Sequence, residues 1–428
     1  MGILIRNADI VTLRKGDEEP FLGDILIDEG RIQEVGGSID TESHEVINAK
    51  GMVALPGLVN AHTHGAMTLL RGYADDLPLN IWLEEKIWPL EEKLTPEDIY
   101  WGTMLALAEM IRGGITAFAD MYFFMDEAAR AVEEVGIRAC LCRGLVAAGG
   151  GADKSLREAD DFVSQWHGGA EGRITAMFGP HAPYTCPPEF LEETVSLAQD
   201  QGVGIHIHLG ETKKEQEDIK RRYGRTPFEY VSDLGLFEQH VLAAHCVHLE
   251  EGDFKILMEA GAYVAHCPQS NLKLASGVAP IPEMVKMGIP VALGTDGAAS
   301  NNNLDLFEEI RLAGVLHKGV SHDPTLIPAR DALEMATIKG VEALGIEGVG
   351  PLQVGGRADL ILLDFDKPHL APLHHTIAQI TYSAGAADVD TVIVDGKILM
   401  EGRELKTMDE ALVRRMAQRR MEHLLEPI

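Results

Sequence analysis

Cysteines are few in this sequence, and they form no pattern typical of a structural site. The chain has five in 428 residues, and no Cys-x-x-Cys pair is present. They stand at Cys140, Cys142, Cys186, Cys246 and Cys267. An odd, sparse set gives no support to a disulfide framework or to a cysteine zinc site. We interpret them as small buried residues in a reducing compartment, which predicts a cytoplasmic protein.

Basic residues and long apolar runs are also scarce. The 37 Lys plus Arg stand against 67 Asp plus Glu, and the resulting net charge of -30 would repel a phosphate backbone or an anionic membrane surface. No run of 18 apolar residues occurs, and the N-terminus lacks the basic start and long apolar segment of a signal peptide. We therefore expect neither a nucleic acid polymer nor a membrane as a partner.

Both ends of the chain carry short β-like runs separated by Gly and Asp turn signals. They occupy residues 3–53 at the start, and residues 358–363 and 389–397 near the end. We predict that residues 1–55 and 355–428 together build one small β-sandwich domain. Residues 56–354 would then form a separate and larger domain.

The middle of the chain alternates apolar runs with amphipathic segments of helix length. The eight strand-like runs are 53–61, 114–120, 138–145, 174–179, 203–209, 241–245, 262–266 and 290–295. Near-continuous apolar strands separated by helices are typical of a parallel sheet that helices cover. Eight such units favour an α/β fold of the (β/α)8 TIM-barrel type, with a doubly wound open sheet as the alternative.

Most of these runs end in histidine or a carboxylate. The residues are His62, His64, Asp120, His181, His206, His208, Glu211, His245, His266 and Asp296. In a barrel the carboxyl ends of all strands face one mouth, so we expect these side chains to converge on one site.

Two His-x-His pairs and one Asp-Gly are the candidates for metal binding. Alternation along a strand points His62 and His64 to the same side, as two ligands of one ion require. In the second pair we expect His208 to bind metal and His206 to orient its neighbours. Asp296 stands between Gly294 and Gly297, which would let the chain turn sharply and expose the carboxylate. Neutral imidazole suits zinc, iron, nickel and copper, so the ligand type leaves the metal open.

Several of these segments resemble the amidohydrolase superfamily. Residues 55–64 (LPGLVNAHTH) are similar to its first-strand signature and residues 294–297 (GTDG) to its last. Residues 70–79 (LRGYADDLPL), 179–181 (GPH), 244–248 (AHCVH) and 270–274 (SNLKL) look like the branch that deaminates 5'-methylthioadenosine and S-adenosylhomocysteine. The resemblance covers almost the whole chain, terminal β domain included. It implies a hydrolytic deaminase that turns an adenine nucleoside, 5'-deoxyadenosine and adenosine included, into the inosine analogue and ammonia.

The resemblance also implies a metal centre. Its ligands would be His62, His64, His208 and Asp296. Since His181, and no lysine, ends the fourth strand-like run, a bridging lysine for two metals is missing and one divalent ion is expected. We expect Zn²⁺, with Fe²⁺ or another divalent ion as the alternative. Such an open site lowers the pKa of a bound water towards ~7.

The catalytic residues implied by the resemblance are Glu211, His245 and Asp296. His245 and Asp296 would accept a proton from the water. Glu211 would bind the substrate as well, and would protonate the purine nitrogen next to the carbon that carries the amino group.

Four more residues match family positions that contact the nucleoside. Trp82 would pack on the 5' substituent, Glu91 would accept the ribose hydroxyls, His181 would bond the purine, and Arg143 would bind an amino-acid carboxylate. The residues alone also allow plainer roles in packing or surface charge. Relatives that prefer S-adenosylhomocysteine look as though they use a second arginine, and Ser155 occupies that position here. We therefore expect uncharged 5' groups to be accepted at least as well. Lys154 and Arg157 stand close by, however, and a shifted loop would let either supply the second cation instead.

Other functions share parts of this pattern. A related aminohydrolase or chlorohydrolase of guanine, cytosine or a triazine would have the same metal motif but would not need an acid such as Glu91 for a ribose. A non-enzymatic scaffold would be expected to lack several ligands, and a metal store would not need Glu211 and His245. The small-molecule partner that we expect is an adenine nucleoside, and we expect a homo-oligomer.

Overall fold

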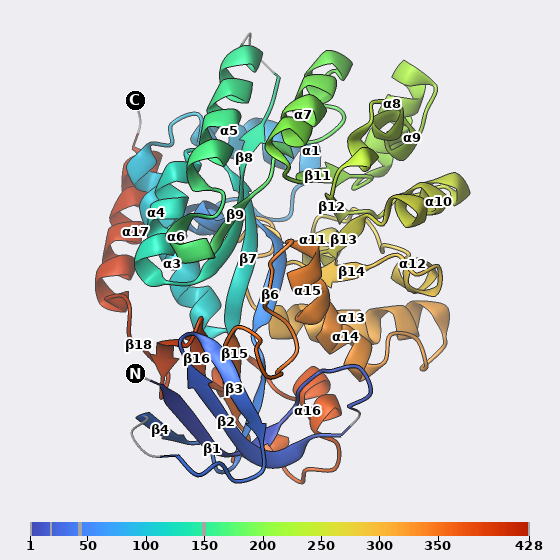
Figure 1. Cartoon of the computed structure of the whole chain (residues 1–428). Helices are drawn as coiled ribbons and strands as arrows, with labels where there is room; N and C mark the ends of the chain where they lie inside the picture. The colour runs from blue at the N-terminus through green and yellow to red at the C-terminus, as the bar shows by residue number, and fades with distance from the viewer. Residues whose placement is uncertain (1, 18, 42–44, 148–150, 427–428) are drawn as a thin grey trace.

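The computed structural model describes residues 2–17, 19–41, 45–147 and 151–426. Its centre is a ring of parallel strands (Figure 1). In chain order these strands are β6 (Leu58–Thr63), β7 (Ile115–Tyr122), β8 (Arg138–Leu145), β9 (Ile174–Ala176), β10 (Gly179–Pro180), β11 (Ile205–Leu209), β12 (Val241–His245), β13 (Tyr263–His266) and β14 (Val291–Leu293). The fourth predicted run, 174–179, is divided between β9 and β10, and the other runs each contribute one barrel strand.

Backbone hydrogen bonds join the two halves of this ring. The strands form two ladders, β10-β8-β7-β6 and β11-β12-β13-β14. On one side, Phe178 accepts from the amide of His206 at 2.9 Å and pairs with Ile205. On the other side, the Asp296 amide donates to His62 O at 3.0 Å. The sheet therefore closes into a barrel, and the open-sheet alternative does not describe it.

A second sheet is built from both ends of the chain. It runs β18-β17-β16-β15-β5-β1-β2-β3, and β4 also pairs with β1. Its strands are β1 (Ile3–Ile10), β2 (Phe21–Asp28), β3 (Arg31–Gly36), β4 (Glu45–Asn48), β5 (Met52–Pro56), β15 (Leu360–Asp364), β16 (Val389–Val394), β17 (Lys397–Glu401) and β18 (Glu404–Leu405). It folds over a hydrophobic core of its own, which Ile5, Ile25 and Leu362 share. The blue and red strands lie side by side below the barrel in Figure 1.

The predicted strand over residues 53–61 is wrong, because the chain changes sheets inside it. β5 pairs antiparallel with β15 in the terminal sheet, whereas β6 pairs parallel with β7 in the barrel. Gly57 stands between them, and a Cβ there would lie 2.1 Å from Thr116 Oγ1. The close approach of the chain to β7 therefore requires glycine at this junction.

A buried ion pair connects the barrel to the terminal sheet. Arg138 on β8 is fully buried, and its guanidinium donates to Asp359 at 3.0 Å and to Asp395 at 2.7 Å. Removing one partner of such a pair costs about 3–5 kcal/mol, because the other charge stays buried. Arg138 therefore helps to hold the terminal sheet against the barrel.

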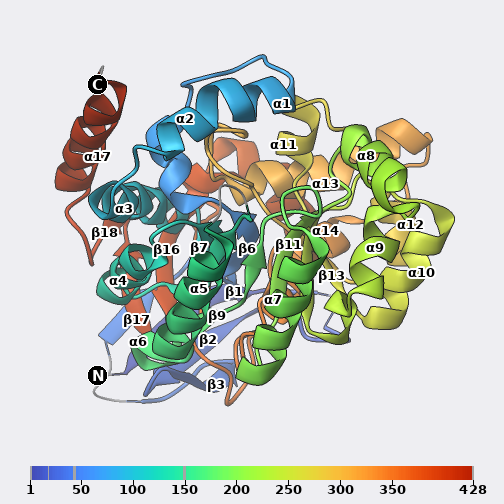
Figure 2. The same ribbon diagram turned by 90° about the horizontal axis from the view of Figure 1, so that it is seen from above.

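Helices surround the barrel strands, as the view from above shows (Figure 2). They include α3 (Pro96–Arg112), α4 (Met125–Val135), α5 (Ala152–Trp166), α7 (Pro188–Gln201), α8 (Lys213–Tyr223), α10 (Glu251–Ala260) and α13 (Leu306–Ser321). Local signals set their ends: Thr95 and Asp98 form a capping box at the start of α3, with Pro96 in its first turn.

Two further segments matter for the site and for the domain boundaries. Residues 79–91 form α1 (Leu79–Ile81), the π-helical turn η2 (Trp82–Ile87) and α2 (Trp88–Glu91), which contribute to the wall of the active-site cavity. The last helix, α17 (Glu410–Leu425), packs on α3, where Arg420 donates to Asp98 at 2.6 Å. Part of the segment 355–428 thus lies against the barrel, and the domain boundaries stay a prediction.

In the part of the chain that the structure describes, we find no helix that combines the length and the apolar character needed to cross a membrane.

Candidate active site

A β-bulge at the end of β6 directs two histidines into the barrel. Asn60 pairs with Phe118, but Thr63 pairs with Asp120, so Ala61 and His62 on β6 together oppose a single residue of β7. Bulges occur beside active sites, where they change the direction of side chains. Ala61 belongs to the cluster inside the barrel. Because of the extra residue, His62 and then His64 also point inward.

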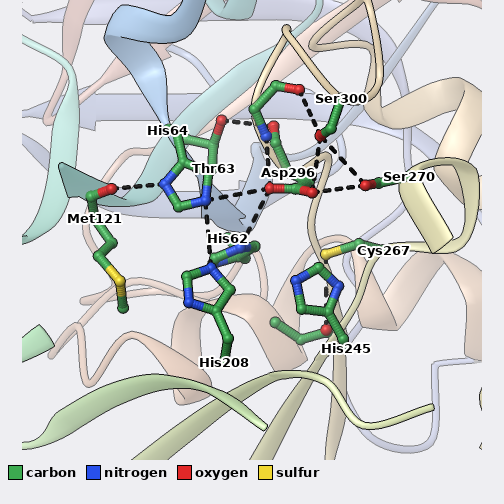
Figure 3. Close-up of polar contacts among 12 residues, drawn as sticks. His62, Thr63, His64, Met121, His208, His245, Cys267, Ser270, Asp296 and Ser300 are labelled. Carbon is green, nitrogen blue, oxygen red and sulfur yellow. Dashed lines mark hydrogen bonds and ion pairs between the residues drawn. The ribbon is translucent and has the colours of Figure 1, made fainter. Parts of the chain in front are cut away.

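Four side chains from three strand ends meet at one point (Figure 3). Asp296 Oδ1 lies 3.5 Å from His62 Nε2 and 3.3 Å from His64 Nε2. His208 Nε2 lies 3.3 Å from His64 Nε2. These are the four ligands that the sequence predicts. Two overlapping groups, His62–His64–Asp296 and His62–His208–His245, have their ligand atoms within 4.8 Å of one another.

In His64 and in His208, the ring nitrogen that points away from the metal-binding point is fixed by a hydrogen-bond partner. His64 Nδ1 lies 2.6 Å from Met121 O, and His208 Nδ1 lies 2.7 Å from His181 O. A carbonyl accepts only from N–H, so the proton sits on Nδ1 and leaves the Nε2 lone pair for a metal. His62 Nε2 is buried without a hydrogen-bond partner.

The electrostatics of this point suit a cation. Burial lowers the pKa of His62 to about 4 and the pKa of His208 well below its usual range, which keeps both rings neutral as ligands must be. Burial also disfavours the charged form of His64, but the hydrogen bond to Asp296 and its negative charge outweigh this effect and raise the pKa of His64 to about 9. Without a metal, a proton therefore occupies His64 Nε2, and a metal ion at this point must displace it. These residues therefore fit a divalent metal ion.

Asp296 is held tightly in an unusual backbone conformation. Its φ is 61°, in the left-handed region that costs a non-glycine residue energy. Ser270 and Ser300 donate to Oδ2 at 2.6 and 2.8 Å. We expected the flanking glycines to allow a sharp turn. Instead they allow close packing, because a Cβ on Gly294 would lie 2.8 Å from His62 Cβ.

His245 also points into the cavity because its own backbone conformation is left-handed. Ala244, just before it, packs inside the barrel, so simple alternation would turn His245 outward. Its φ of 74° redirects the ring into the cavity wall. Its Nδ1 lies 2.9 Å from Asn271 Oδ1, which leaves Nε2 towards the metal-binding point.

Glu211 lies in the loop after β11 and lines the same cavity. Burial raises its pKa, so the carboxyl keeps a proton more readily than an exposed glutamate does. Ser276 donates to its Oε1 at 3.4 Å. Glu215 accepts from the amides of Gly210 and Glu211 at 3.0 and 2.9 Å, which fixes the loop.

The cavity above the metal-binding point has a volume of about 980 Å³. The structure places all the predicted substrate contacts, Trp82, Glu91, Arg143, His181 and Glu211, in its wall. Much of the remaining wall is apolar, with Met67, Leu79, Leu83, Trp88, Phe123 and Phe162 among the contributors. A largely apolar pocket with a few placed polar groups is typical of a small-molecule site.

Each of the four predicted nucleoside contacts has a partner that positions it. The Tyr122 hydroxyl donates to Glu91 Oε1 at 2.7 Å, and Trp82 Nε1 donates to Ala74 O at 2.9 Å. His181 Nδ1 lies 3.0 Å from Thr185 Oγ1. Arg143 pairs with Glu158, a residue that belongs to none of the motifs described above.

Three of the residues expected to converge belong neither to the metal-binding point nor to the described lining of the cavity. The prediction that His266 belongs to the site is wrong. Its side chain lies on the same side of β13 as that of Val264, which faces out of the barrel. The His266 ring faces His317, and the two ring centroids are 5.5 Å apart. Asp120 accepts from the Gly65 amide at 2.9 Å and supports the loop after β6. His206 lies behind His62, where it can orient that ring as predicted.

Several supporting residues were missed by sequence reasoning. Ser270 and Asn271 belong to the SNLKL segment, so that motif could have indicated them. Ser300, Glu215 and Glu158 carry no sequence signal beyond their position near the site. Their roles depend on contacts between segments far apart in the chain.

A barrel with His and Asp side chains gathered at the carboxyl ends of its strands, joined to a sheet of terminal strands, defines the class of metal-dependent hydrolases. The model of the amidohydrolase family matches residues 53–399. The chain belongs to this family, which confirms both the resemblance and the fold class.

Known proteins resemble this chain over nearly its whole length. It is 55% identical to a 5-methylthioadenosine/S-adenosylhomocysteine deaminase of Pelotomaculum thermopropionicum, over 98% of each chain. It is 50% identical to a 5'-deoxyadenosine deaminase of Methanosarcina mazei, over 99% of this chain and 98% of that one. A solved adenosine deaminase from Xanthomonas campestris with bound zinc has 36% identity and a TM-score of 0.95, and the match covers 99% and 98% of the two chains.

Proposed function

We propose that this protein hydrolytically deaminates adenine nucleosides. Water replaces the amino group of the purine, and the products are the inosine analogue and ammonia. The observation that carries the proposal is the convergence of four ligand atoms at the floor of a cavity whose wall holds Glu211 and His245. The deaminase names of relatives at 50% identity or more support the substrate class.

We propose one divalent ion, Zn²⁺ first and Fe²⁺ or another divalent ion as alternatives, held by His62, His64, His208 and Asp296. When bound, such an ion acts as a Lewis acid that makes water a nucleophile near neutral pH. The zinc in the similar adenosine deaminase supports this choice.

Three residues then move protons. His245 and Asp296 accept the proton of the attacking water, since both face the metal-binding point. Glu211 delivers a proton to the ring nitrogen next to the amino-bearing carbon, which makes that carbon electrophilic. Its burial supports this role, because a general acid must still carry its proton near neutral pH.

The cavity wall supports the remaining assignments. Glu91 would accept the ribose hydroxyls, and the bond from Tyr122 holds its carboxylate in place. Trp82 would pack on the 5' substituent, His181 stands beside His208 and would bond the purine, and Arg143 would bind an amino-acid carboxylate.

A spectroscopic assay tests this proposal. The purified, metal-loaded protein is incubated with 5'-methylthioadenosine, 5'-deoxyadenosine, adenosine and S-adenosylhomocysteine, and the ultraviolet change from adenine to hypoxanthine is followed. We expect turnover of at least one of them. Turnover of guanine, cytosine or a chloro-triazine alone would favour the alternative functions.

We also propose a homo-oligomer and a cytoplasmic location. The five free, buried cysteines support a reducing compartment. Light scattering of the purified protein tests the first proposal, and fractionation of the source cells tests the second.

A further inference from the structure

The end of the cavity that α4 and α5 form is rich in acidic groups. Asp126, Glu158 and Asp161 line it together with Phe162. Among the described residues of the cavity wall, Arg143 is the one Lys or Arg. A 5' substituent that reaches this end therefore meets one cation among several carboxylates.

That one cation already has a partner. The guanidinium of Arg143 forms an ion pair with Glu158 on α5, and it also donates to Gly144 O at 3.1 Å. The Arg143 side chain is 21% exposed and that of Glu158 is 40% exposed, so the pair sits at the wall and not in open solvent.

Neither Ser155, at the position of the second arginine, nor the two nearby cations are among the described residues that line the cavity. Ser155 is buried, and its hydroxyl donates to Ala152 O at 2.8 Å within α5. Lys154 is 77% exposed and approaches Glu158 at 3.5 Å. The other nearby cation, Arg157, is exposed as well.

We propose that Glu158 is a specificity-determining residue, the internal counter-ion of Arg143 that makes this end of the cavity a site for uncharged 5' substituents. The inference rests on the proposed function and adds to it the chemical class of the 5' group. A substrate carboxylate must compete with Glu158 for Arg143, in a cavity whose wall also holds Asp126 and Asp161. An uncharged methylthio or methyl group displaces no ion pair and packs on the apolar wall.

The test compares two substrates in wild type and in Glu158→Gln. In each protein, kcat/KM is measured with S-adenosylhomocysteine and with 5'-methylthioadenosine, and the first value is divided by the second. We expect this ratio to rise by roughly tenfold or more in the variant, the scale of one charge-assisted hydrogen bond made available to the substrate. The rise should appear chiefly as a lower KM for S-adenosylhomocysteine.

Two controls separate pairing from general charge. Asp161→Asn removes the same charge from the same wall without freeing Arg143, so its ratio should change much less. Arg143→Gln combined with Glu158→Gln should lose the gain, because no guanidinium remains to bind the carboxylate.

The outcomes distinguish the two proposals. An unchanged ratio in Glu158→Gln, an equal rise in Asp161→Asn, or a gain that survives in the double variant would overturn the inference while deamination itself stands. A wild-type enzyme that deaminates no adenine nucleoside would overturn the proposed function, and the inference with it.

Discussion

His62 Nδ1 lies 2.9 Å from His206 Nε2, and the two rings are buried inside the barrel. His206 Nδ1 in turn lies 3.6 Å from Cys142 Sγ. If His62 Nε2 binds the metal, its Nδ1 carries the proton and donates it to His206. His206 would then be a positioning residue that fixes the orientation and the tautomer of a metal ligand.

Replacing His206 should weaken metal binding without removing a ligand. We expect His206→Phe to raise the Kd for Zn²⁺ by roughly 10- to 100-fold, the usual effect of losing the partner of a ligand histidine. His206→Gln keeps an acceptor and should lose less. Competition with a chromophoric chelator measures both. Equal affinities of wild type and His206→Phe would remove His206 from the metal centre.

The protein should bind about one divalent ion per chain, and His208→Ala should lose most of it. The variant lacks one of the four proposed ligands. Elemental analysis of the wild type and the variant after dialysis makes the comparison. Two ions in each active wild-type chain, or a metal-free variant with full activity, would contradict the four-ligand site.

Glu211→Gln should lower kcat by at least ~10²-fold, the usual scale for a lost general acid. Glutamine keeps the size and polarity of the side chain but cannot deliver a proton. The metal content should stay close to that of wild type, because Glu211 is not a ligand. Steady-state kinetics and elemental analysis of the same preparation give both values, and retained turnover would exclude Glu211 from the mechanism.

Gly294→Ala should destabilise the protein by ~1–3 kcal/mol, the usual cost of forcing extra atoms into a packed core. The new Cβ would lie 2.8 Å from both Cβ and the backbone nitrogen of His62, so β6 must move. Gly319→Ala is the matched control, because a Cβ on α13 meets nothing within 4 Å. Thermal unfolding should show a clear loss for Gly294→Ala and none for Gly319→Ala.

Much of the fold could be predicted from the sequence, since apolar runs and helical periods depend on neighbouring residues. The run over 53–61 shows the limit of such patterns. β5 and β6 look like one strand because both are apolar, and only pairing with β15 or β7 assigns them to different sheets.

The sequence by itself determined which side chains can act as ligands and proton donors: His62, His64, His208, Asp296 and Glu211 are visible in its motifs. The tertiary structure decided where they point. A bulge after Asn60 turns His62 inward, and a φ of 74° turns His245 inward against the alternation of its strand. His266 has neither a bulge before it nor a left-handed backbone, and its ring faces His317 outside the barrel. The physical reason is that alternation gives only relative sides along one strand, whereas bulges and left-handed residues persist only where surrounding contacts outweigh their cost.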